Sequence, residues 1–338
     1  MEGCFVTTGS AAARVRHVRD GMSGERPGIK RARKSAGQVI SRDFKLNKYK
    51  YLMILPVLVF FALFAYKPMA GLIIAFKEYR PRLGIMGSKW VGLTHFRNFF
   101  RDIYFTRIIR NTFSISALNI VFGFPAPILL ALLLNEARST KFKRTVQTIT
   151  YMPYFISLIV ACSLIKIYSQ NNGLFSQIAV AFGGVKQNLL MNKNAFYPIY
   201  VISDIWQHIG WNSIIYLAAL SGIDQEQYEA ARIDGANRFK QMRYITLPGL
   251  APTIIILLIL RMGSVLNVGY EKIILLYSEA IYQVADVIST YLYRRGIVAE
   301  NPSFSYATAI GLFNSVVNLA FLLSFNRISK KTAKFSLF

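Results

Sequence analysis

Residues 229–248 read EAARIDGANRFKQMRYITLP and lie between two long apolar runs of the chain. Residues 229–233 are mostly good helix formers, and Gly235 interrupts the helix that they predict. A second amphipathic turn follows up to Ile245. Pro248 then closes the stretch, because proline lacks an amide hydrogen and disfavours a helical residue before it. An interrupted polar helix of this kind suits the docking of a soluble partner better than the crossing of a bilayer.

The apolar runs on either side indicate a membrane protein that crosses the bilayer several times. The chain has 338 residues, of which 54% are hydrophobic and 14% aromatic. Several runs approach the length of about 20 residues that a membrane-spanning helix needs. We predict an all-α fold with six membrane spans, at about 51–76, 112–134, 149–168, 197–220, 252–276 and 304–325. The fourth of these spans is unusually polar.

The distribution of basic residues predicts the orientation in the membrane. The formal net charge is +24, and much of this surplus lies in residues 1–50 and in short loops beside the spans. Such a distribution sets membrane orientation and argues against nucleic acid as a partner. Six spans place both termini in the cytoplasm of a multi-pass cell-membrane protein. The loop 78–110 is also basic and pulls the other way, since this topology places it outside.

Three segments follow from this topology. Residues 1–48 are predicted to be a disordered, basic cytoplasmic tail, residues 49–328 the membrane domain and residues 329–338 a second cytoplasmic tail. Met22 is a second candidate start, which leaves open whether residues 1–21 are translated.

The stretch 229–248 resembles the EAA loop of permeases from binding-protein-dependent ABC importers. Glu-Ala-Ala at 229–231, then Gly235 after three residues, then Ile245, Leu247 and Pro248 after nine more, match that motif at its spacing. Three further segments resemble the oligosaccharide or polysaccharide branch of type I importers: FGFPAPILLALLLNEARSTKFKRTVQTITYMPYFIS, VADVISTYLYRRGI and SYATAIGLFNSVVN. The resemblance covers roughly residues 45–338 and implies the six-helix, MetI-like permease fold.

The resemblance also implies partners and roles for the motif residues. A permease of this family forms half of a membrane dimer, paired with a second, related permease. Two ATPase subunits bind it from the cytoplasm, and an extracytoplasmic sugar-binding lipoprotein delivers the substrate. Residues 225–248 would form the cytoplasmic coupling helix. Its expected ATPase-coupling residues are Glu229, Ala230, Ala231 and Gly235, with Ile245, Leu247 and Pro248 packing the element against the membrane bundle.

Polar residues inside the predicted spans are candidates for the substrate path. Ionisable groups in a membrane are costly and usually face the bundle interior or a water-filled path. Amides, charges and aromatic faces are also the groups that bind a sugar. The alternative is that they form interhelical hydrogen bonds that only fix the packing. The candidates are Asp204, His208, Trp211, Asn212, Arg261, Asn267, Tyr270, Glu271, Asn314 and Asn318.

The roles of two of these candidates stay open. Arg261 has three candidate partners, namely Glu271, Asp204 and an acidic sugar, and the sequence does not choose among them. His208 lies four residues after Asp204, on the same face of a helix. A lone intramembrane histidine suggests either proton coupling or a structural hydrogen bond, and the absence of a carboxylate relay favours the latter.

The sequence argues against an enzyme. It contains no G-x-x-x-x-G-K-[ST] phosphate loop, so we expect the chain to bind no cofactor, with ATP and Mg on the partner ATPase subunits. Neither a nucleophile–base set nor metal-ligand spacing is present. Two alternatives remain: a secondary transporter of sugars or other polar solutes working without ATP, and a membrane enzyme acting on lipid-linked sugars. The resemblance implies an oligosaccharide and leaves open whether it is acidic and derived from a polysaccharide.

Overall fold

The computed structural model describes residues 46–332 and 336–337. The predicted basic tail therefore lies outside the described residues, apart from residues 46–48, and so does part of the second tail. The described chain comprises two compact units, which meet at Lys67 and Pro68. The first contains α2 (Lys48–Phe61) and the π-helical η1 (Ala62–Tyr66). No residue of α2 is buried, as expected for an apolar helix facing lipid.

The second unit begins with a short helical segment and a small two-stranded sheet. The short α3 (Lys67–Met69) crosses the boundary, and η2 (Ala70–Phe76) continues it. Strand β1 (Lys77–Glu78) pairs antiparallel with β2 (Lys89–Trp90), around the short α4 (Gly84–Gly87). The amphipathic α5 (Thr94–Arg101) follows and buries Phe99 against Tyr306 and Phe313 of the last helix.

The second span is longer than the predicted 112–134. It comprises α6 (Phe105–Leu118), η3 (Asn119–Gly123) and α7 (Pro125–Glu136). The sequence did not predict its first turns as part of the span, because they are polar. Tertiary contacts satisfy the hydrogen-bonding groups of these turns: Asn111, for example, donates to two backbone carbonyl groups more than 170 residues away.

The third span is bent, whereas the sequence predicted one straight helix over 149–168. The helix α8 (Thr140–Tyr151) and the 3-10 turn η4 (Met152–Phe155) meet α9 (Leu158–Ser169) at 99°. Pro153 lies in the turn before the bend, and the Ser157 hydroxyl accepts from the Val160 amide to begin the new helix. The helix α10 (Leu174–Ala181) and the turn η5 (Leu189–Met191) follow.

The fifth span is misplaced in the prediction. After the 29-residue α11 (Lys193–Ser221) come α12 (Gln225–Ile233), α13 (Arg238–Gln241), the π-helical η6 (Met242–Thr246) and α14 (Leu247–Met262). The membrane helix thus covers Arg238–Met262, not 252–276. A non-helical break follows at 263–269, and α15 (Tyr270–Leu276) is a separate helix. Pro248 does not end the helix: it lies in the first turn of α14, which follows η6 without a break.

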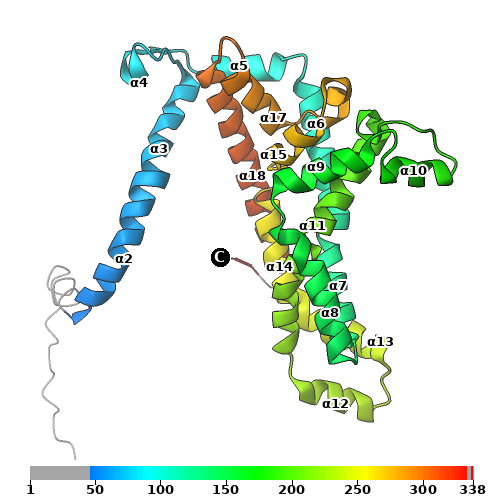
Figure 1. The fold of residues 1–338 in the computed structure, drawn as a ribbon. Coiled ribbons are helices and arrows are strands. Elements are labelled where there is room, and N and C mark those ends of the chain that lie inside the picture. The colour runs from blue at the N-terminus through cyan, green and yellow to red at the C-terminus, as the bar shows by residue number, and fades with distance from the viewer. Residues whose placement is uncertain (1–45, 333–335, 338) are drawn as a thin grey trace, which may run out of the picture. The chain divides into compact units, whose positions relative to one another are not determined.

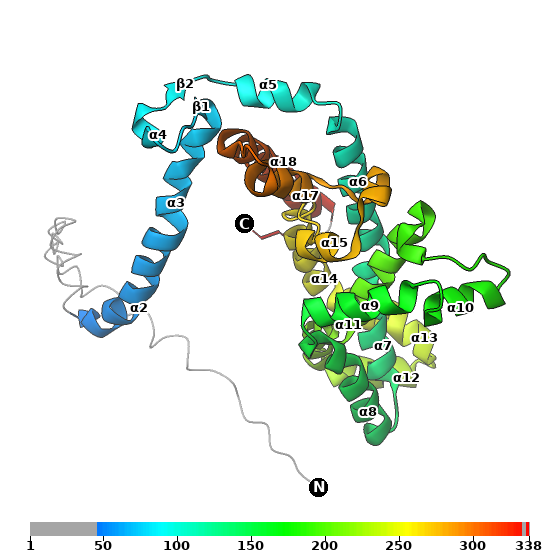
Figure 2. The ribbon, with the colours of Figure 1, turned by 45° about the horizontal axis from the view of Figure 1, so that its top comes forward.

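The rest of the chain forms several short helices and then one last long helix. The elements are η7 (Glu279–Ile281), α16 (Tyr282–Ala285), α17 (Ile288–Tyr293), η8 (Arg294–Val298) and the last helix, α18 (Phe304–Thr332). Helix α18 extends beyond 328, the predicted edge of the membrane domain. In Figure 1 and Figure 2 it lies beside α14 and α17, and the three helices pack together.

The helices account for the predicted six spans. Four described helices are long and apolar enough to cross a membrane, and a fifth results if the bent pair counts as one span. Helix α11 has the length for the sixth, but its many polar residues lower its hydropathy. It lies at the centre of the bundle, where it packs against α7, α8 and α14. Several of its polar side chains, among them Ser203, Gln207 and Ser213, are therefore buried against protein.

Candidate functional site

The predicted coupling element projects from one end of the second unit (Figure 1). Helix α12 begins at the capping residue Asp224, whose carboxylate accepts from the Glu226 amide, and contains no buried residue. Gly235 has φ +75°, a left-handed conformation that favours glycine, and turns the chain into α13. Glu229 and Ala230 are exposed, and Ile233 is 87% exposed. The element is therefore free to bind a partner.

Part of the end of the motif packs against the bundle, whereas Pro248 is exposed. Leu247 contacts a core cluster that includes Tyr216 and Leu220 of α11 and Leu250 of α14. Ile245 is half-buried just before it, and Pro248 lies in the first turn of α14. The motif thus joins an exposed helix to a membrane span through the short turn at 234–237.

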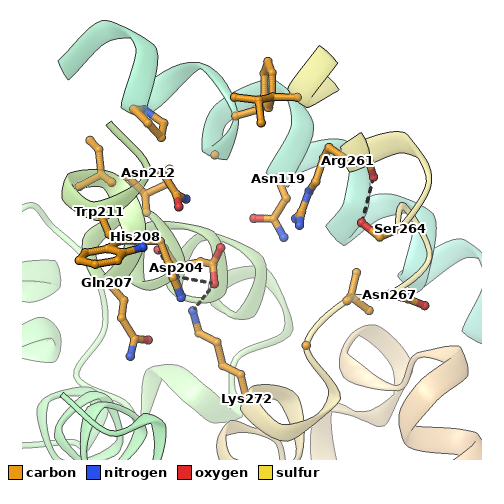
Figure 3. Close-up of a pocket in the computed structure, with 18 of the residues that line it drawn as sticks. Asn119, Asp204, Gln207, His208, Trp211, Asn212, Arg261, Ser264, Asn267 and Lys272 are labelled. Atoms are coloured by element: carbon orange, nitrogen blue, oxygen red, sulfur yellow. Dashed lines mark hydrogen bonds and ion pairs between the residues drawn. The ribbon is translucent and has the colours of Figure 1, made fainter. Parts of the chain in front are cut away.

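A cavity of about 860 Å³ lies between α11, α14 and the break that follows α14 (Figure 3). Amide, charged and aromatic side chains share its lining with apolar ones. Seven of the ten predicted path residues line it: Asp204, His208, Trp211, Asn212, Arg261, Asn267 and Glu271. Tyr270, Asn314 and Asn318 are not among the lining residues.

An ion pair occupies one wall of the cavity. The Lys272 ammonium lies 3.2 Å from the Asp204 carboxylate and donates to the carbonyl of Tyr200, also at 3.2 Å. The His208 ring nitrogen Nδ1 lies 3.6 Å from the same carboxylate and 3.0 Å from the Asp204 carbonyl. Lys272 is buried, and Asp204 neutralises its charge, so the ammonium is not free to bind a ligand.

Arg261 lies apart from this pair, in the opposite wall, where its side chain extends toward Asn119 (Figure 3). Neither Glu271 nor Asp204 is its partner, since among the described residues no carboxylate lies within 4.0 Å of its guanidinium. Two of its three candidate partners, Glu271 and Asp204, are therefore not paired with it in the structure. The guanidinium remains available for an anionic group inside the cavity.

An aromatic platform adjoins the ion pair. The Trp211 ring is stacked on Tyr154 with ring centres 4.5 Å apart and planes 3° from parallel, and Phe155 meets Trp211 edge-on. Tyr154 and Phe155 come from the turn at the bend in the third span, so this bend supports the Trp211 ring, which lines the cavity. Trp211 is 40% exposed and offers a flat face of the kind that packs on a sugar ring.

Asn314 and Asn318 hold the backbone rather than line the cavity. Both side-chain amides donate to the Asn267 side-chain oxygen, at 2.8 and 3.2 Å, and the Asn318 oxygen accepts from the Leu266 amide at 2.9 Å. Non-helical backbone at membrane depth is tolerated where protein groups satisfy it. These two residues thus form the interhelical hydrogen bonds that the packing alternative expects.

Sequence reasoning missed several lining residues. Lys272 was inside a predicted span and carried the same signal as Asp204, namely an ionisable group in an apolar run. Asn119, Gln207 and Ser264 also line the cavity. Their signal was weaker, because uncharged polar residues are common in packed membrane helices.

A second polar cluster lies outside the cavity, around Asp286. Asp286 is fully buried, and its carboxylate binds Arg294 at 2.7 Å, Arg107 at 3.1 Å and the Thr290 hydroxyl at 2.9 Å. Burial alone would lower the pKa of Arg294, but the hydrogen bond and charge of Asp286 outweigh it and raise that pKa above its usual range. The cluster ties α6 to the segment between α15 and α18.

Residues 123–334 match the family described as binding-protein-dependent transport system inner membrane component. The chain belongs to this family. It is 46% identical to the polygalacturonan/rhamnogalacturonan transport system permease protein YteP of Bacillus subtilis (strain 168), over 84% of this chain and 88% of the relative. It is 43% identical to the protein LplB of the same organism, over 90% of this chain and 96% of the relative.

A solved structure agrees with these relatives. A bacterial ABC transporter involved in the import of the acidic polysaccharide alginate contains a chain that is 41% identical, with a TM-score of 0.79. The alignment covers 87% of this chain and 99% of that one. A second structure of the alginate transporter, in complex with an alginate pentasaccharide-bound periplasmic protein, matches with a TM-score of 0.80.

Family membership confirms the predicted permease fold and the importer assignment. The protein is a multi-pass membrane component of a binding-protein-dependent transport system, and its relatives are transport permeases rather than enzymes. Between the importer and the secondary transporter, the family decides for the importer. The inward-facing polar residues of α11 are accordingly those of a permease.

Proposed function

We propose that this chain forms half of the translocation path for an acidic oligosaccharide, driven by ATPase subunits that dock on residues 225–248. A second, related permease would complete the path, and an extracytoplasmic sugar-binding lipoprotein would deliver the cargo. Two ATPase subunits would bind ATP and Mg, with no cofactor held by this chain. Both termini would then lie in the cytoplasm, on the same side as α12.

The cavity is the observation that carries the proposal. About 860 Å³ is room for a few sugar units, and the lining offers amides, the Trp211 ring and the Arg261 guanidinium, which has no carboxylate partner among the described residues. Arg261 matters most for the acidic class, because Lys272 is neutralised by Asp204 while Arg261 is not. A guanidinium binds a carboxylate with two parallel hydrogen bonds. The printed substrates of two relatives, polygalacturonan/rhamnogalacturonan and alginate, support the same class.

The exposed α12 supports the coupling role. It is a helix with no buried residue, and only the short turn at 234–237 separates it from the fifth span. Closure of an ATPase dimer would move such a helix as a lever, and the rigid spans would convert this motion into alternating access.

The experiment uses the complete complex with its partner permease, ATPase subunits and binding protein. We expect ATP hydrolysis to rise on adding binding protein loaded with acidic oligogalacturonates and to stay basal with neutral maltooligosaccharides. Glu229→Lys and Gly235→Pro should abolish the stimulation. Glu300→Lys, the same charge change at an exposed site remote from the motif, should leave it intact. Unchanged coupling and assembly in both motif variants would show that the docking helix is misplaced.

A further inference from the structure

The coupling helix α12 has few side-chain contacts with the rest of the described chain. Most of its residues are exposed, and Tyr228 and Ala231 are half-buried. Within the described residues, Tyr228 is the only α12 side chain that forms a hydrogen bond outside its own helix. Its phenolic oxygen lies 3.0 Å from the Thr246 hydroxyl, 18 residues later.

Thr246 is held rigidly at the base of the fifth span. It is 1% exposed and ends the π-helical turn η6, and its hydroxyl also donates to the Gln241 carbonyl at 3.4 Å. The next residue, Leu247, packs against Tyr216 and Leu220 of α11. With its proton directed to Gln241, the Thr246 oxygen accepts the hydrogen bond from Tyr228, so both hydroxyl groups are satisfied.

A second contact between the coupling element and the bundle is weaker. Arg238 of α13 lies 3.4 Å from the Glu136 carboxylate at the end of α7, but both side chains are well exposed. Exposed ion pairs are screened by solvent and contribute little. The partly buried hydroxyl pair is therefore the firmer connection, and it is directional.

We propose that the Tyr228–Thr246 hydrogen bond is the joint through which movement of α12 reaches the fifth span. The inference rests on the proposed function and deepens it, since it names the positioning residue behind the docking surface. Tyr228 fixes the angle of α12 relative to α14. Without the bond, α12 still binds its ATPase partner but tilts without displacing α14, so that ATP hydrolysis and transport become uncoupled.

The test uses Tyr228→Phe, which removes one hydroxyl and keeps the ring. In proteoliposomes with the complete complex, we expect normal assembly and normal basal ATP hydrolysis, with about threefold to tenfold less sugar imported per ATP, as fits one lost hydrogen bond. Thr246→Val should give the same loss, and the double variant should be no worse than either single one. Tyr66→Phe is the matched control: that residue is 69% exposed, it lies outside residues 225–248, and its hydroxyl has no hydrogen-bond partner in the described chain.

Three results would contradict the proposed role of the Tyr228–Thr246 hydrogen bond. They are an unchanged import ratio in Tyr228→Phe, additive losses in the double variant, and loss of assembly in Tyr228→Phe, which would make Tyr228 a docking residue. The proposed function fails differently, because the unmodified complex would then show no sugar-stimulated ATP hydrolysis at all.

Discussion

Lys272 and Asp204 form an ion pair in one wall of the cavity, with 3.2 Å between the ammonium nitrogen and a carboxylate oxygen. The two side chains differ in burial, because Lys272 is 5% exposed and Asp204 is 30% exposed. A charge left without its partner is costly in proportion to its burial. The pair should therefore respond unequally to the removal of one member or the other.

Asp204→Asn should destabilise the protein more than Lys272→Met. The first change leaves a buried ammonium without a counter-charge, at a cost of about 3 kcal/mol or more, whereas the second leaves a carboxylate that still faces the cavity and His208. The double variant should recover most of the loss. Thermal unfolding in detergent measures all three, and a larger loss for Lys272→Met would contradict this account of the pair.

Gly210 marks the closest approach between α11 and α8. A Cβ atom at this position would lie 2.1 Å from the Thr150 carbonyl oxygen. Small residues allow membrane helices to approach closely in this way. Gly210→Ala should force the helices apart and lower the free energy of unfolding by about 1–3 kcal/mol.

The control for this substitution is Gly71→Ala, where the added Cβ meets nothing within 4 Å. It should be neutral or slightly stabilising, because alanine restricts the unfolded chain. Folded yield and melting temperature would be compared in the same detergent. Equal effects at the two glycines would refute the close approach.

Asp102 should make stability depend on acid pH. Burial alone would raise its pKa, but hydrogen bonds from Tyr291, the Tyr104 amide and Tyr306 outweigh burial and lower the pKa below its ordinary value of 3.8. A carboxyl whose pKa is lowered by folding stabilises the folded state above the unfolded pKa. That contribution is lost as the pH falls through the folded pKa.

The melting temperature difference between the unmodified protein and Asp102→Asn should therefore be constant from about pH 5 to 7 and shrink below about pH 4. Glu78→Gln is the matched control, since the Glu78–Arg80 pair is exposed and should contribute little at any pH. A difference that grows as the solution is acidified would have the wrong sign for the proposed hydrogen bonds.

The sequence alone determined the family, the all-α membrane fold and the position of the polar, interrupted helix that carries the motif. These follow from local signals: the apolar runs fix the spans, and Glu229, Gly235 and Pro248 fix the motif by their spacing. The predicted ends of the first, fourth and sixth spans lie within a few residues of the ends of the observed helices. The exception is the end of α18, which extends further than predicted. Seven of the ten residues predicted for the substrate path line the cavity. Sequence analysis identified them because ionisable and amide groups stand out in apolar helices.

Only the tertiary structure decided where the fifth span lies and which polar residues serve the cavity. Residues 252–276 read as one apolar run, yet the chain breaks after Met262, because Asn318, 52 residues away, satisfies the Leu266 amide. Lys272 became the partner of Asp204 over 68 residues. Hydropathy is a property of adjacent residues, whereas these hydrogen bonds and ion pairs form between segments that only folding brings together. A break that is costly in isolation is stable once its polar groups find distant partners.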